Sequence, residues 1–158
     1  MKTIIFSISV LLSTSIFSTS QVAANNPQLG NYTVEQSKTD VNLNLVLVEL
    51  TEGIIPKGFD KAWKTIGPQW ADKVKSAAEV SLLSASLLEL ADNIKDKYYK
   101  PTWEKSKEKW VKQVKDARSS LALAGLLKSL YNNLNPEVFT ADWTGKSSIW
   151  LETLSKIE

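Results

Sequence analysis

The chain has 158 residues and a formal net charge of +2, and it contains no cysteine and no histidine. Without cysteine there is no disulfide or thiolate ligand, and without histidine the usual zinc sites and the Ser-His arrangement of hydrolases are also excluded. A charge so close to neutral disfavours nucleic acid as a partner. The composition therefore predicts neither a familiar hydrolase nor a protein that holds a metal or cofactor.

The N-terminal residues 1–24 have the pattern of a signal peptide. Lys2 precedes an apolar stretch, residues 4–17, which is too short to span a membrane. A polar region follows and ends in Val22-Ala23-Ala24, small residues of the kind that fit a signal peptidase. We therefore predict cleavage after Ala24 and a secreted or periplasmic mature protein.

The aromatic residues reveal an internal repeat. The six tryptophans form three pairs, with seven positions between the members of a pair and 40 positions between successive pairs. Another aromatic residue stands four positions before the first tryptophan of each pair. Such recurrence indicates one structural unit used three times. The repeat signature consists of Phe59, Trp63, Trp70, Tyr99, Trp103, Trp110, Phe139, Trp143 and Trp150.

Upstream of each tryptophan pair, aliphatic residues have the spacing of a helix. Leu43, Leu47, Leu50 and Ile54 are separated by 4, 3 and 4 positions, which lines one helical face, and the same rows recur in the other two copies. Residues 41–45 alternate like a strand, but their repeat partners are rich in leucine, alanine and serine. We therefore predict a helix in all three copies.

Proline positions suggest where some helices start. Pro68 and Pro101 suit the first turn of a helix, because proline lacks the amide hydrogen that this turn leaves unpaired. After Pro101 the chain runs to Ala117 without a breaker. These observations predict two long helices, one from about Pro68 to Asn93 and one from about Pro101 to Asn133, the latter with a bend near Ser119-Ser120.

The predicted fold is all-α, an irregular bundle of about four helices built from three imperfect 40-residue repeats. The helical domain is expected to cover residues 37–158, preceded by a flexible arm at 25–36. A solenoid-like stack of the three units is the alternative architecture.

One string of residues also resembles a known family. Residues 87–94, followed by Pro101-Thr102-Trp103 and Trp110, resemble the third WHIM motif, or WSD motif, of DDT-domain chromatin-remodelling subunits. That motif pairs a leucine-rich helix with Trp-x3-Arg-x2-Trp. Through the repeat, the resemblance covers most of residues 43–150 and implies a helical fold.

The chromatin role of that family does not follow from the resemblance. In the family, the WHIM region is associated with nucleosome and linker-DNA contacts, whereas this chain is expected to be exported and is nearly neutral. The polar residues of the motif have also changed. The family's arginine falls on Gly67, Lys107 and Ser147, and its glutamate falls on Thr51, Ala91 and Tyr131.

Candidate surface contacts lie in the second repeat. The repeated aromatic residues are expected to pack in the core, with an exposed aromatic groove as the alternative. Tyr98 lies in a turn and is not one of the aromatic residues that recur every 40 positions. It is therefore expected to be exposed. A lysine-rich helix face, interleaved with Glu104 and Glu108, is expected to be solvated, with an anionic membrane surface or polymer as the weaker alternative. Its candidate contacts are Lys105, Lys107, Lys109 and Lys112.

These features predict an exported, non-enzymatic helical module that binds a protein partner. Carboxylate pairs such as Glu89 and Asp92 are interpreted as part of a solvated helix face, and no glycine-rich phosphate loop is present. The alternative function is a carrier of a small apolar ligand or lipid in an aromatic-lined cavity. An enzyme of unfamiliar type would require a buried carboxylate or lysine with a displaced pKa.

If the repeated tryptophans are core residues, replacing Trp103 or Trp110 with alanine should destabilise the fold by about 3–5 kcal/mol, because each change leaves a large cavity. Thermal unfolding of the two variants measures the effect. An unchanged melting temperature would contradict the packing role.

Overall fold

The computed structural model describes residues 35–157, with side chains from Leu43 onward. The predicted signal peptide, 1–24, lies outside the described residues. So does the predicted arm, 25–36, except for residues 35 and 36, which belong to the first helix. The signal peptide and the secreted location therefore stay predictions.

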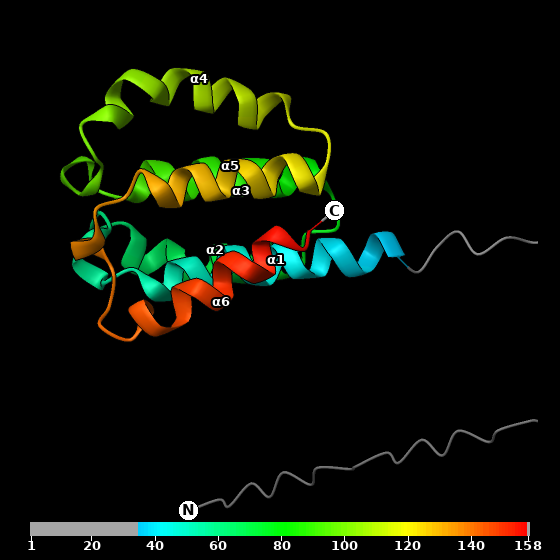
Figure 1. Ribbon diagram of the computed structural model, residues 1–158, viewed down its shortest axis with the longest axis horizontal. Helices are drawn as coiled ribbons and strands as arrows, with labels where there is room; N and C mark the ends of the chain where they lie inside the picture. Colours follow the sequence, from blue (N-terminus) through cyan, green and yellow to red (C-terminus); the bar gives the residue numbers. More distant parts are fainter. Residues whose placement is uncertain (1–34, 158) are drawn as a thin grey trace, which may run out of the picture. The chain divides into compact units, whose positions relative to one another are not determined.

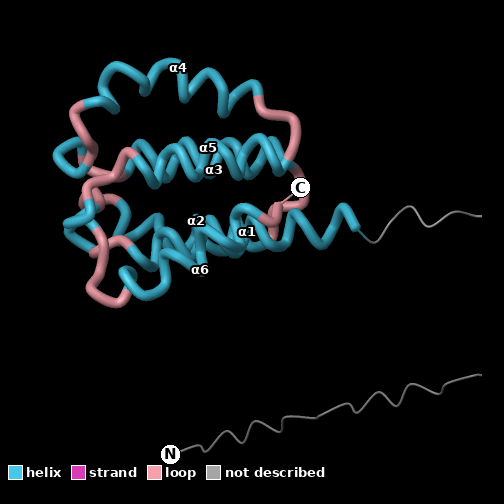
Figure 2. The backbone as a smooth tube through the Cα atoms, viewed as in Figure 1, coloured by secondary structure: helices cyan, strands magenta, loops and turns pink. Residues whose placement is uncertain are grey.

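The described residues form six α-helices and three short 3-10 helices, with no strand among them beyond isolated bridges (Figure 2). This confirms the all-α fold. The α-helices are α1 (Glu35–Gly53), α2 (Trp63–Lys75), α3 (Val80–Asn93), α4 (Thr102–Asp116), α5 (Ser120–Asn132) and α6 (Trp143–Ser155). The 3-10 helices are η1 (Pro56–Gly58), η2 (Asp96–Tyr98) and η3 (Pro136–Val138).

The prediction of two long helices is wrong, and with it the expected number of about four. The region expected to form one helix from Pro101 is divided at Ala117, whose backbone is extended and whose side chain is buried. Ser119 then caps α5, because its Oγ accepts a hydrogen bond from the Ala122 amide at 3.2 Å. The first repeat divides between α2 and α3 in the same way, and Pro68 lies inside α2 instead of starting a helix.

The six helices form an inner and an outer set. The inner helices α1, α3 and α5 all contact one another. Each outer helix packs on two inner ones: α2 on α1 and α3, α4 on α3 and α5, and α6 on α5 and α1 (Figure 1). Since the third unit returns to the first, the repeats form a closed ring. The six helices thus form the predicted helical bundle, with the three repeats in an approximately three-fold arrangement and not in the alternative solenoid-like stack.

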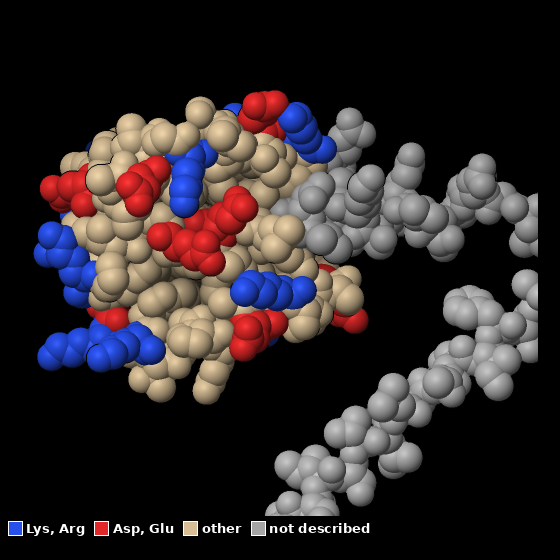
Figure 3. All heavy atoms as spheres, turned by 90° about the horizontal axis from the view of Figure 1, so that it is seen from below, with Lys and Arg blue, Asp and Glu red and all other residues tan. Residues whose placement is uncertain are grey.

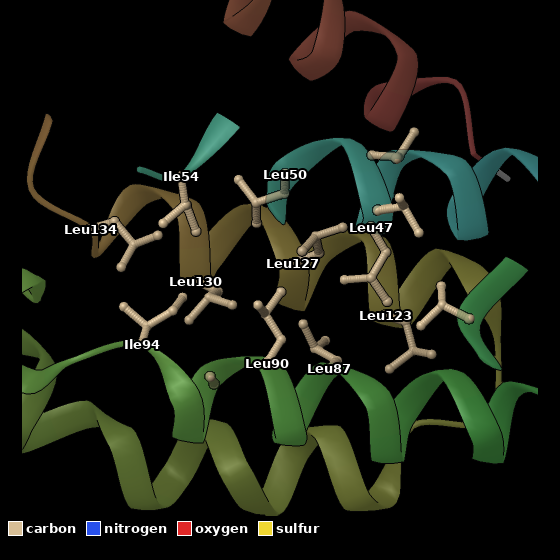
Figure 4. Close-up of a cluster of buried hydrophobic side chains, with 14 of the residues drawn as sticks. Leu47, Leu50, Ile54, Leu87, Leu90, Ile94, Leu123, Leu127, Leu130 and Leu134 are labelled. Atoms are coloured by element: carbon tan, nitrogen blue, oxygen red, sulfur yellow. The ribbon is translucent and has the colours of Figure 1, made fainter. Parts of the chain in front are cut away.

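Leucines from the three inner helices fill the centre of this ring (Figure 4). The side chains meet at the axis in equivalent rows, and the space between them is too small for a water molecule. The aliphatic residues that have helical spacing in the sequence are therefore the residues that form the core. The axial residues are Leu43, Leu47, Leu83, Leu87, Leu123 and Leu127.

Short backbone bridges join the ends of the repeats. In each unit, the aromatic residue four positions before the first tryptophan forms an antiparallel backbone bridge. Its partner is the aliphatic residue that follows an inner helix of another unit. The third bridge connects the last unit to the first, as a closed ring requires. The bridged pairs are Phe59 with Ile94, Tyr99 with Leu134, and Phe139 with Ile54.

Two helical glycines provide a matched test of the closing interface between α1 and α6. A Cβ atom on Gly53 of α1 would overlap the Trp143 ring, lying 2.7 Å from Cζ3, whereas a Cβ on Gly125 of α5 would meet nothing within 4 Å. We expect Gly53→Ala to destabilise the fold by about 1–3 kcal/mol through overpacking. Gly125→Ala should instead stabilise it by about 0.5–1 kcal/mol. Urea unfolding measures both, and a stabilising Gly53→Ala would contradict the close approach.

Candidate functional site

The second tryptophan of each pair ties an outer helix to an inner helix. In every repeat this residue is buried, and its indole Nε1 donates a hydrogen bond to a backbone carbonyl of the following unit. The accepting positions are themselves 40 residues apart, so all three interfaces share one register. The bonds run from Trp70 to Ser86 at 3.0 Å, from Trp110 to Leu126 at 2.9 Å, and from Trp150 to Val46 at 2.8 Å.

The first tryptophan of each pair stacks on the aromatic residue four positions before it. Trp103 and Trp143 are buried, while Trp63 is half-buried. Since every ring of the signature contacts another, these residues form packed clusters and not a continuous exposed groove. The ring centroids are 4.8 Å apart for Phe59 and Trp63, 4.9 Å for Tyr99 and Trp103, and 5.6 Å for Phe139 and Trp143.

The predicted exposure of Tyr98 is wrong, since its side chain is only 5% exposed. The repeat explains this burial, because the equivalent positions are Gly58 and Val138, both also buried. These positions lie close together: a Cβ atom on Gly58 would come within 2.8 Å of Val138 Cγ2. The row of glycine, tyrosine and valine was visible in the sequence but was too varied in type to be recognised.

The candidate lysines form part of the outer face of α4. Lys105, Lys109 and Lys112 are exposed. Lys107 is half-buried, and its Nζ lies 3.8 Å from Asp92 Oδ1 on α3. The structure thus brings Lys107 to a neighbouring helix and leaves the other three lysines in solvent.

A cavity of about 360 Å³ lies between α1 and α6, and we call it the α1/α6 groove. On the face that carries α6, charged and uncharged side chains surround a hollow (Figure 3). The apolar side chains Leu45 and Ile149 at the groove are 48% and 66% exposed. The full lining is Leu45, Val46, Glu49, Glu52, Gly53, Thr140, Trp143, Lys146, Ile149, Trp150 and Thr153.

The apolar rim is specific to this interface. At the positions equivalent to Leu45, the other repeats carry Ala85 and Gly125. At the positions equivalent to Ile149, they carry Gln69 and Lys109. The ring is therefore nearly symmetric in its backbone contacts, but only the interface between the first and last units combines two large exposed aliphatic side chains. Sequence reasoning missed this groove because its walls are about one hundred residues apart, as Trp150 and Val46 are.

Two further features of residues 35–157 bear on the kind of site. No α-helix among them has the length and apolar character needed to cross a membrane. Nor does this part of the chain contain a group of three or more acidic, histidine or cysteine side chains placed to hold a metal ion.

A protein-family model described as a domain of unknown function (DUF8799) matches residues 77–148. The matched segment begins before α3 and ends within α6. No curated protein and no solved structure matches the chain. The resemblance to the WHIM motif stays a hypothesis.

Tyr99 provides a pH-dependent test of the aromatic packing. Its hydroxyl donates a hydrogen bond to the Ala91 carbonyl at 2.8 Å. Burial raises the pKa of the Tyr99 phenol above its ordinary value, and the negative charges of Asp92 and Asp96 raise it further. The unfolded chain releases this proton near pH 10, while the folded chain retains it, so the stability contributed by the neutral phenol is lost as the pH rises above about 10.

Tyr99→Phe is a suitable variant, because phenylalanine occupies both equivalent positions. Near pH 7 it should be less stable than the wild type by about 0.5–1.5 kcal/mol, through loss of the hydrogen bond. This difference should shrink above pH ~10. Urea unfolding across the alkaline range measures it, and a difference independent of pH would contradict the assignment.

Proposed function

We propose that this protein is an exported, non-enzymatic helical interaction module that binds a protein partner in the α1/α6 groove. In this proposal, an apolar side chain of the partner enters the groove and packs against the exposed side chains of Leu45 and Ile149, above the buried rings of Trp143 and Trp150. The exported location rests on the predicted signal peptide, and the non-enzymatic character rests on the absence of histidine and cysteine.

The proposal rests on the positions of the exposed apolar side chains. Among the residues whose side chains are described, four large hydrophobic ones are exposed, and two of these, Leu45 and Ile149, line the same cavity. Single exposed hydrophobic residues need no explanation, but apolar side chains grouped around a cavity are typical of interaction sites. The other two are Leu82 and Leu121.

The walls of the groove are held in place by the fold itself. Trp150 is fixed by its hydrogen bond to the Val46 carbonyl, and Trp143 packs directly against Gly53. A preformed site loses less conformational entropy on binding than one that must first become ordered. The fixed walls therefore favour a recognition surface.

A carrier of a small apolar ligand is the second candidate. The groove volume of about 360 Å³ is at the lower end of the range for ligand pockets. By contrast, the leucine-filled axis has no room for a ligand. A small apolar molecule retained through purification and detected by native mass spectrometry would favour the carrier.

The proposal can be tested with peptides selected from a displayed random library on the mature chain. We expect Ile149→Asp to weaken binding of the selected peptides about tenfold, because it places a charge in the apolar wall. Leu121→Asp is the matched control, since Leu121 is 58% exposed but lies outside the groove. Isothermal titration of both variants measures the effect. Undiminished binding to Ile149→Asp would overturn the proposal.

A further inference from the structure

The α1 side of the groove carries two carboxylates that form no ion pair with any described residue. Glu49 and Glu52 are three positions apart on α1, and both are exposed and line the groove. Neither forms a salt bridge within the described part of the chain. The lining also contains one ammonium group, that of Lys146, so two negative charges face one positive charge.

The equivalent of Glu49 in the second repeat does have a partner. Glu89 on α3 pairs with Lys73 on α2, at 3.4 Å between Nζ and Oε2. At the α1/α6 interface the position equivalent to Lys73 is Thr153. Because the tryptophan hydrogen bonds give both interfaces the same register, Thr153 is the counterpart of Lys73 in space as well as in sequence. A threonine side chain cannot neutralise Glu49.

The equivalent of Glu52 also has a partner in the second repeat. Asp92 on α3 pairs with Lys107 on α4 at 3.8 Å. The equivalent of α4 in the first repeat is α2, so this pair corresponds to the α1/α2 side of Glu52 and not to the α1/α6 groove. There the position equivalent to Lys107 is Gly67, which has no side chain. Glu49 and Glu52 are thus acidic like Glu89 and Asp92. The lysines that pair with Glu89 and Asp92, however, have no basic equivalent beside α1.

From this charge pattern we infer that the partner of the α1/α6 groove is a peptide segment that carries a lysine or arginine next to a bulky apolar residue. The inference rests on the proposed function. The apolar side chain packs against Leu45 and Ile149, and the neighbouring cation lies beside Glu49 and Glu52. Lys146 then disfavours a second basic residue at the opposite side of the groove.

This charge preference should contribute more to selectivity and association rate than to affinity, because both carboxylates are exposed. Complementary charges speed the encounter, and like charges on a competing acidic peptide would slow it. The contribution should also decrease as the salt concentration rises, since salt screens exposed charges.

The test uses the same random-peptide library, selected on the mature chain, with Glu49→Gln and Glu52→Gln as variants of nearly unchanged shape. We expect the selected peptides to be enriched in lysine or arginine next to aromatic or large aliphatic residues. Each glutamine variant should weaken their binding roughly two- to fivefold at low salt, the range for exposed ion pairs. Glu89→Gln is the matched control, because Glu89 is the equivalent residue outside the groove, and it should leave binding unchanged.

The outcomes separate this inference from the proposed function. Peptides that lack basic residues, or that bind the two glutamine variants as tightly as the wild type, overturn the charge inference; loss of binding in Ile149→Asp would still support the groove. Peptides insensitive to all three groove variants overturn both. Self-association of the chain that Ile149→Asp abolishes would assign the groove to a second copy and would also overturn the inference.

Discussion

The hydrogen bond from the second tryptophan of each repeat to the next inner helix sets the register of the whole helical ring. The buried indole N–H of Trp70 or Trp110 donates to one helical carbonyl, which fixes where the outer helix lies along the inner helix. The buried Nε1 atoms of Trp103 and Trp143, by contrast, have no acceptor among the described residues. Once that register is fixed, the leucines of the inner helices meet at the axis in matched rows. The bond from Trp150 to Val46 spans 104 positions and applies the same constraint to the closing interface.

Because the three interfaces share a register, differences between them can be assigned to particular side chains. Where the α2/α3 interface has Lys73 opposite Glu89, the closing interface has Thr153 opposite Glu49. The backbone arrangement is retained, so the substitution changes the surface without changing the fold. The α1/α6 groove thus departs locally from the repeated arrangement. Its apolar rim distinguishes it from both equivalent interfaces, and the lack of an ion pair at Glu49 among the described residues distinguishes it from the α2/α3 interface.

Much of the fold could be predicted from the sequence, because the 40-residue recurrence and the aliphatic spacing are local patterns. The complete division between α4 and α5 was missed, because Ala117 and Ser119 are neither glycine nor proline and only a bend near Ser119-Ser120 was expected. The prediction that Tyr98 is exposed was wrong. The three equivalent positions carry glycine, tyrosine and valine, which are too unlike for the repeat to be recognised there. The groove was not predictable, because it requires knowing that the last unit packs on the first.

The ring closure also determines when the groove can exist. Its two walls, α1 and α6, are the first and last of the described helices, so neither wall can form the groove during synthesis until α6 has emerged. Contacts of such long sequence separation tend to form late in folding, after local helix pairs have assembled. A nascent or truncated chain that ends before α6 would therefore contain most of the core and yet have no groove. Completion of folding and formation of the groove are in this way the same event.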